Sequence, residues 1–221
     1  MKRLLCGVLL LLAASPSRAG FIINGDFSSG NTGFTTNYVY SPGAIGAQQS
    51  YDVLSNPFPA HPSAASYGDH TTGSGLMMAI NESTTANQLI WSETVAVMAG
   101  SNYLFSAWVS SWVATAPSQV DILFNGVSIG LIQAPSTTAV WVESTATWNS
   151  GIATSLTIEL RNRTHADVGG DFALDDISLS GPSPAAVPEP STIVMALSAL
   201  GVAGLGWLRR RRMGKPLDNS R

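Results

Sequence analysis

Apolar and polar residues alternate through the middle of the chain, which is the pattern of β-strands that bury one face. In residues 103–113 the face that we assign to the core consists of Tyr103, Phe105, Ala107, Val109 and Val113. A second stretch alternates in the same way, with Leu156, Ile158 and Leu160 on one face. Residues 171–180 predict a last strand, and its apolar spacing shifts at Asp175 and Asp176, as a β-bulge would produce.

One pair of strands is joined by a strong turn signal. Asn125 and Gly126 separate two alternating apolar runs, and this pair suits the positive φ angles of a type I′ turn. Residues 41–75 are rich in Ser, Pro, Gly and His with few periodic apolar positions, so we predict long surface loops there. About eight to ten short strands over residues 20–181 predict an all-β fold, an antiparallel two-sheet β-sandwich or jelly roll.

The N-terminus has the order of a secretory signal. Two basic residues precede an apolar run over 4–14 and the small-residue site Ser17-Arg18-Ala19. We predict a signal peptide at 1–19, removed by signal peptidase, because about eleven apolar residues are too short to span a bilayer as a helix. Cys6, the one cysteine of the chain, leaves with this peptide, which excludes disulfides and thiol chemistry from the mature protein.

The C-terminus has the features of a membrane segment with a basic stop. A Pro-rich linker at 182–191 leads into an apolar run at 192–208, and a basic tail follows at 209–221. As a transmembrane helix this run would span about 26 Å, near the lower limit for a bilayer core. By the positive-inside rule the arginines of the tail stay cytoplasmic, so the domain before the linker faces outward.

The sequence Val-Pro-Glu-Pro-Ser at 187–191, then the apolar run with its glycines, then four arginines, resembles the PEP-CTERM sorting signal of exopolysaccharide-producing Gram-negative bacteria. The resemblance implies that an exosortase of the inner membrane recognises this end and cleaves near the motif. The implied processing and retention residues are Pro188, Glu189, Pro190, Arg209, Arg210, Arg211 and Arg212. The alternative is an ordinary C-terminal membrane anchor after a proline linker.

Charge is segregated along the chain. Residues 20–187 carry twelve Asp and Glu against two Arg, a net charge of −10, and most basic residues lie near the two ends. A nucleic-acid-binding protein needs basic side chains that displace phosphate counterions. The acidic middle of the chain therefore excludes that class.

The two ends of the predicted domain resemble the first and last strands of galactose-binding-like jelly rolls, a group that includes carbohydrate-binding modules. The segments are Ile-Ile-Asn-Gly-Asp-Phe-Ser at 22–28 and Gly-Asp-Phe-Ala-Leu-Asp-Asp-Ile-Ser-Leu at 170–179. The resemblance implies a structural calcium ion with Asp175 as a ligand. Ser28 stands where a Glu is usual, and Asp26 or Asp171 would replace that ligand. The alternative is that Asp175 and Asp176 bend and solvate an edge strand.

Catalytic motifs such as Gly-x-Ser-x-Gly, His-Glu-x-x-His and phosphate-binding glycine loops do not occur in the sequence. His61, His70 and His165 lie in polar, loop-like stretches, which favours solvated turn residues over catalytic bases. We therefore expect no enzymatic activity, with a polysaccharide-active enzyme as a remote alternative.

Trp108 and Trp112 fall on the face of their strand opposite the predicted core. Four residues apart, they would lie about 13 Å from each other, a spacing that suits successive sugars of a chain. Indole rings stack on the C–H faces of sugars while polar neighbours bind the hydroxyls. The alternative is that this face packs inward and both tryptophans are core residues.

Together these features predict an exported bacterial protein that passes transiently through the inner membrane to the envelope, the surface or the extracellular matrix. The predicted role is noncatalytic binding of an extracellular polysaccharide. The rival role is structural, in a matrix or biofilm, through hydration, negative charge and weak self-association.

Overall fold

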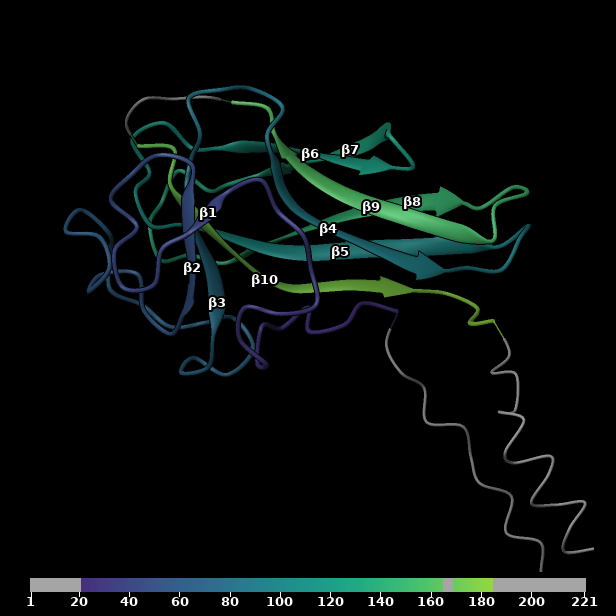
Figure 1. Cartoon of the computed structure of the whole chain (residues 1–221), viewed down its shortest axis with the longest axis horizontal. Coiled ribbons are helices and arrows are strands. Elements are labelled where there is room, and N and C mark those ends of the chain that lie inside the picture. Colours follow the sequence, from purple (N-terminus) through teal and green to yellow (C-terminus); the bar gives the residue numbers. More distant parts are fainter. Residues whose placement is uncertain (1–20, 165–168, 185–221) are drawn as a thin grey trace, which may run out of the picture. The chain divides into compact units, whose positions relative to one another are not determined.

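The computed structural model describes residues 21–164 and 169–184, and this part of the chain forms ten strands in two sheets (Figure 1). The six-stranded sheet has the order β1-β2-β3-β10-β5-β8, and the four-stranded sheet has the order β4-β9-β6-β7. The strands are β1 (Val39–Tyr40), β2 (Ser50–Leu54), β3 (Met77–Asn81), β4 (Leu89–Ala96), β5 (Asn102–Ser111), β6 (Gln119–Phe124), β7 (Val127–Gln133), β8 (Val142–Asn149), β9 (Ser155–Asn162) and β10 (Phe172–Ser180). Neighbours pair antiparallel except β1 and β2. The expected two-sheet β-sandwich is confirmed.

The predicted signal peptide at 1–19, the apolar run at 192–208, the tail at 209–221 and the Pro-Glu-Pro motif of the linker lie outside the described residues. Within the ranges that the structure describes, no helix is long and apolar enough to cross a bilayer.

The main core lies between the two sheets and is built from the apolar faces that the alternation predicts. Tyr103, Phe105, Ala107 and Val109 of β5 are buried, and so are Leu156, Ile158 and Leu160 of β9. Phe105 of the six-stranded sheet meets Phe124 of the four-stranded sheet edge to face, with ring centroids 5.9 Å apart. Each strand therefore buries one face and leaves the other free for polar residues.

The hairpin and the bulge are also confirmed. Asn125 and Gly126 join β6 to β7 with φ angles of 49° and 78°, both positive as a type I′ turn requires. In β10 the register against β5 shifts between Asp175 and Ser178, and Asp176 has a φ of 47°. Because of this extra residue, Asp175 and Ser178 pair with Trp108 and Ser106, which are two residues apart on one face of β5.

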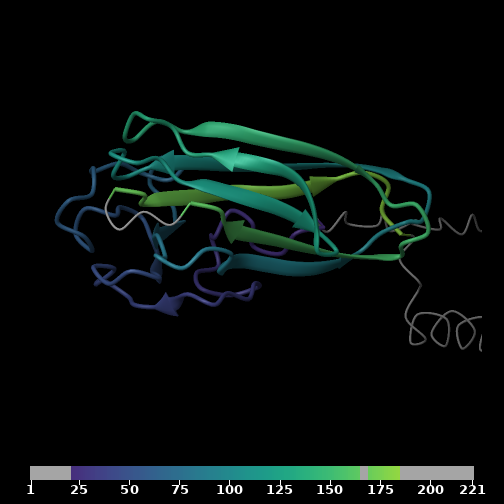
Figure 2. The same ribbon diagram turned by 90° about the horizontal axis from the view of Figure 1, so that it is seen from above.

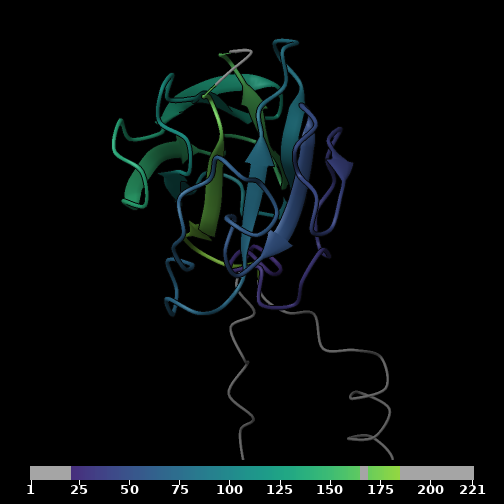
Figure 3. The same cartoon turned by 90° about the vertical axis from the view of Figure 1, so that its left-hand side faces the viewer.

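Residues 41–75 are more than the surface loops that the sequence predicts. They contain β2, and three of their apolar residues are buried against the outer face of the six-stranded sheet. This second core consists of Ile45, Ala60, Ala64, Met77, Ala79, Trp112 and Ala173. Figures 2 and 3 show these blue segments gathered at one end of the long strands. They cover the outer face around β3 and leave it open farther along β5 and β8.

The expectation that Trp112 shares an open face with Trp108 is wrong. The Trp112 side chain is 0% exposed, and its Nε1 donates a hydrogen bond to the Phe172 carbonyl at 2.6 Å. The His61 ring lies 5.0 Å away between centroids. Trp112 is therefore a core residue of the loop-covered part of the sheet and offers no surface to a ligand.

This burial yields a stability prediction. Trp112→Phe removes the hydrogen bond to Phe172 and leaves a small void, so it should lower the free energy of unfolding by about 2–3 kcal/mol. Trp108→Phe, at a half-buried position, is the matched control and should cost less. Urea denaturation followed by circular dichroism measures both. Equal midpoints for Trp112→Phe and the wild type would contradict the second core.

Candidate functional site

The open part of the six-stranded sheet presents a polar surface. Its outward side chains are Leu104, Ser106 and Trp108 of β5, Glu143, Thr145 and Thr147 of β8, and Ser178 and Ser180 of β10. All of them are exposed or half-buried. Ser106 and Ser178 lie side by side across the strands, with their Oγ atoms 2.9 Å apart. This surface is rich in hydroxyl groups, and Trp108 is its one aromatic side chain.

An open cleft of about 460 Å³ lies at the Trp108 end of this surface. The N-terminal segment forms one wall, β5 the floor and the β10 bulge the other wall. The lining residues are Ile22, Asn24, Gly25, Asp26, Ser106, Trp108, Asp176, Ile177 and Ser178. We refer to this site as the Trp108 cleft. It combines an indole with amide, hydroxyl and carboxylate groups, which is the composition of a polar small-molecule site.

The N-terminal wall is fixed by the Asn24-Gly25 pair. Asn24 has a φ of 57°, and its side-chain amide donates to the carbonyls of Gly30 and Thr32, each at 2.9 Å. The Ile177 amide donates to the Gly25 carbonyl at 2.9 Å. A Cβ atom at residue 25 would lie 2.0 Å from the Ile177 carbonyl oxygen, so glycine is needed for this close approach.

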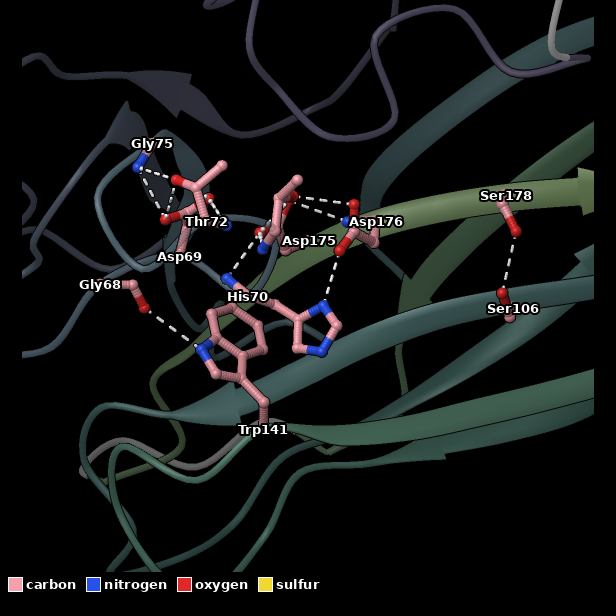
Figure 4. A network of polar contacts seen from close by, with 11 residues as sticks. Gly68, Asp69, His70, Thr72, Gly75, Ser106, Trp141, Asp175, Asp176 and Ser178 are labelled. Carbon is pink, nitrogen blue, oxygen red and sulfur yellow. Dashed lines mark hydrogen bonds and ion pairs between the residues drawn. The ribbon is translucent and has the colours of Figure 1, made fainter.

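The β10 bulge anchors the loop at 67–75 (Figure 4). The buried carboxylate of Asp175 accepts hydrogen bonds from the amides of His70 at 2.8 Å and Thr71 at 3.2 Å. The Asp176 carboxylate contacts His70 Nδ1 at 2.6 Å and accepts from the Thr71 hydroxyl at 2.8 Å. Within the loop, Asp69 accepts from the Gly75 amide at 2.7 Å. The β10 carboxylates thus hold the loop at His70 and Thr71, and the Asp69 carboxylate closes it at Gly75.

The anchored loop places His70 on Trp108. The two rings are stacked, with centroids 3.7 Å apart and an interplanar angle of 14°. Trp141 meets the edge of His70 at 5.9 Å, and its Nε1 donates to the Gly68 carbonyl at 3.2 Å. The sequence pattern does not predict that His70 and Trp141 belong to the site. Each is an isolated residue in the sequence, and the contacts that join them are long-range.

The carboxylates named as calcium ligands, Asp175, Asp26 and Asp171, all accept hydrogen bonds within the protein. Both carboxylate oxygens of Asp175 accept hydrogen bonds. Oδ1 accepts from the Asp176 amide at 2.8 Å, and Oδ2 accepts from the His70 amide. Asp26 accepts from the amide and hydroxyl of Ser28, and Asp171 accepts from the Glu82 amide at 3.2 Å. Among the residues with described placement, no three acidic, histidine or cysteine side chains group as metal ligands. Calcium binding with Asp175 as a ligand stays a prediction, since a carboxylate oxygen that accepts a hydrogen bond keeps a lone pair for a cation.

Two buried carboxyl groups have raised pKa values: Asp171, just before β10, and Asp175, within it. Burial raises the pKa of Asp171 from 3.8 to about 6, although the hydrogen bond from the Glu82 amide works in the opposite direction. Burial likewise raises the pKa of Asp175 to about 6, against the hydrogen bonds from the Asp176 and His70 amides. Both groups therefore bind a proton more tightly in the folded protein than in the unfolded chain.

Comparison with known proteins identifies the C-terminal segment. The PEP-CTERM protein-sorting motif matches residues 186–212, which include Pro188, Glu189, Pro190 and the four arginines. The chain carries a PEP-CTERM sorting motif. This motif indicates an exported protein that is sorted at the membrane, and it implies an exosortase as the processing partner. No curated protein sequence matches the chain.

Solved structures share the sandwich fold at low sequence identity. An arabinose-bound α-L-arabinofuranosidase matches with a TM-score of 0.52 and 13% identity, over 77% of this chain but 27% of the enzyme. The xylan-binding domain CBM22-1 of Paenibacillus barcinonensis matches with a TM-score of 0.44 and 15% identity, over 73% and 94% of the two chains. A family 16 carbohydrate-binding module matches with a TM-score of 0.45 and 15% identity, over 72% of this chain and 99% of the module. These likenesses concern the fold.

The raised pKa of Asp171 predicts a pH effect on stability. Above about pH 6 the buried carboxylate is ionised and costs folding free energy. This cost falls as the pH drops from 6 toward the ordinary pKa of 3.8, and it is gone below that value, where the residue is protonated in both states. Asp171→Asn removes the charge but keeps an acceptor for the Glu82 amide. The variant should therefore melt at a higher temperature than the wild type at pH 7, with a difference that shrinks toward pH 4. A difference that is constant with pH would contradict the raised pKa.

Proposed function

We propose that this exported protein binds an extracellular polysaccharide without acting on it, and that the Trp108 cleft is the binding site. The observation that carries this proposal is the half-buried indole of Trp108, held flat against His70 beside a row of hydroxyl, amide and carboxylate groups. Sugars have C–H faces that pack on aromatic rings and hydroxyls that need both donors and acceptors. The cleft offers both kinds of contact within one volume.

The rigidity of the cleft supports binding. The carboxylates of Asp175 and Asp176 fix the loop that carries His70, and His70 holds the Trp108 ring by stacking. A side chain that is already ordered loses less entropy when a ligand arrives, so more of the contact energy appears as affinity. The N-terminal wall is fixed in the same way through Gly25 and Ile177.

The carboxylates of the cleft already have hydrogen-bond partners in the protein. Asp26 accepts hydrogen bonds from Ser28, and Asp176 contacts His70 and Thr71. Such acceptors can position sugar hydroxyls. We propose that they do so, and that the protein has no hydrolytic activity.

The sorting motif supports a place for this binding outside the inner membrane. We propose that signal peptidase removes residues 1–19, that an exosortase processes the chain near Pro188, Glu189 and Pro190, and that the domain then lies at the surface or in the exopolysaccharide matrix of a Gram-negative bacterium. The strong net negative charge of residues 20–187 is compatible with a hydrated polysaccharide environment.

Binding is tested by affinity electrophoresis through gels that contain the host exopolysaccharide or one of a panel of plant and bacterial glycans. The wild type should be retarded by at least one glycan. Trp108→Ala should lose at least about ten-fold in affinity, the loss expected for about 1.4 kcal/mol or more of stacking and packing. Asp26→Asn should weaken binding less, since it removes a charge and keeps an acceptor.

The matched control is Asp121→Asn, which changes an acidic residue of the four-stranded sheet that pairs with Arg163 at 3.3 Å. It should migrate as the wild type does. Unretarded migration of the folded wild type through every gel would favour the structural matrix role. Release of new reducing ends would instead indicate an enzyme.

Processing gives a separate prediction. In a host with an exosortase, Glu189→Ala should leave the precursor uncleaved and associated with the membrane, because the implied recognition sequence is lost. Immunoblots of membrane and external fractions measure the ratio of precursor to product. Asp218→Ala, in the tail beyond the matched motif, is the control, and equal cleavage of the two variants would contradict recognition through the motif.

A further inference from the structure

One end of the sandwich carries three loops without any charged residue. Each loop is taken with the strand residues that border it: residues 97–102 end with the first residue of β5, residues 125–127 end with the first residue of β7, and residues 149–155 run from the last residue of β8 to the first of β9. These residues include no Asp, Glu, Lys or Arg. The loops before β5 and β9 lie at the right-hand end of Figure 1 and are joined by the Gly100 amide, which donates to the Gly151 carbonyl at 2.6 Å. The turn at Asn125 is bonded to β9, because the Asn125 amide donates to the Thr157 carbonyl at 2.9 Å. We call this surface the uncharged end.

Each loop of the uncharged end exposes one large aliphatic side chain. Ile152 is 98% exposed, Val127 66% and Met98 42%. Ile152 lies in a tight turn in which the Ala153 amide donates to the Ser150 carbonyl at 2.8 Å. Single exposed apolar residues are common, but these three lie on loops that carry no charge, on a domain that is otherwise strongly acidic.

The chain leaves the domain at this same end. The Tyr103 hydroxyl donates to the Pro182 carbonyl at 2.8 Å and accepts from the Met98 amide at 2.7 Å. The ring of Phe21, at the start of the described chain, meets Tyr103 edge to face at 5.6 Å. Both ends of the domain are therefore fastened beside Met98.

The distance from this exit to the apolar run of the sorting motif is short. Nine residues, and so ten Cα–Cα steps, separate Pro182 from Thr192, the first residue of the run. A fully extended chain covers at most about 3.6 Å per residue, so these two points are at most about 36 Å apart. In a precursor whose apolar run is in the membrane, Pro182 therefore stays within about this distance of the start of the run. The domain, which the chain leaves at Pro182, is then close to the bilayer surface.

We propose that the uncharged end contacts the lipid bilayer while the precursor is held at the membrane, with Ile152 and Val127 entering the headgroup region. Anionic headgroups repel the acidic surfaces of the domain, whereas an end without charge meets no such barrier. Because the short tether keeps the local concentration of the domain high, a weak contact of a few aliphatic side chains is sufficient. The proposal rests on the sorting motif and not on glycan binding.

The test uses the full chain with Cys6→Ser, which contains no cysteine, reconstituted into vesicles of phosphatidylcholine and phosphatidylglycerol. A single cysteine is introduced as Ile152→Cys or Val127→Cys and labelled with an environment-sensitive fluorophore. The emission of both labels should shift to the blue, and brominated lipids should quench most of it.

The matched control is Val39→Cys on β1, because Val39 is 65% exposed, close to the exposure of Val127. Its label should keep the emission of a water-exposed dye and escape quenching. Adding Ile152→Asp to the Val127-labelled chain should reduce the quenching, and circular dichroism shows whether each variant is folded. Equal emission and quenching at residues 152 and 39 would overturn the proposal.

Discussion

The bulge at Asp175 and Asp176 in β10 is the interaction on which the candidate site depends. One extra residue in the strand turns Asp175 toward the loop at 67–75 and brings Asp176 to the rim of the Trp108 cleft. The same bulge places the Ile177 amide where it binds the Gly25 carbonyl. The bulge thus binds two segments that are far apart in the sequence, the loop at 67–75 and the N-terminal segment at Gly25. A regular strand would not present these groups to either segment.

The energetic cost of this arrangement lies in the burial of Asp175. Its side chain is fully buried, and its raised pKa shows that desolvation outweighs the hydrogen bonds that stabilise the ionised form. An apolar residue at this position would avoid that cost but could not accept hydrogen bonds from the amides of His70 and Thr71. Asp175 therefore positions the loop, and through the loop it places His70 on Trp108, although its burial costs stability.

Sequence patterns predict the parts of this fold that depend on near neighbours. The alternation in β5 and β9, the turn at Asn125 and Gly126 and the bulge in β10 all have short-range signals, and all are confirmed. The burial of Trp112 has no such signal. Alternation separates the two faces of a strand, but it does not show that a distant segment at 41–75 buries Trp112 on the outer face and leaves Trp108 half-buried against His70.

The two proposed surfaces are compatible because β5 connects them. The strand begins at Asn102 in the uncharged end and reaches Trp108 six residues later, about 20 Å away at the rise of a β-strand. A domain that rests on the bilayer by its uncharged end would therefore hold the Trp108 cleft well above the headgroups, on a sheet face that stays open to solvent. The domain could then bind a polysaccharide while it is still at the membrane. Processing would release the domain together with its bound glycan and would not be needed for binding.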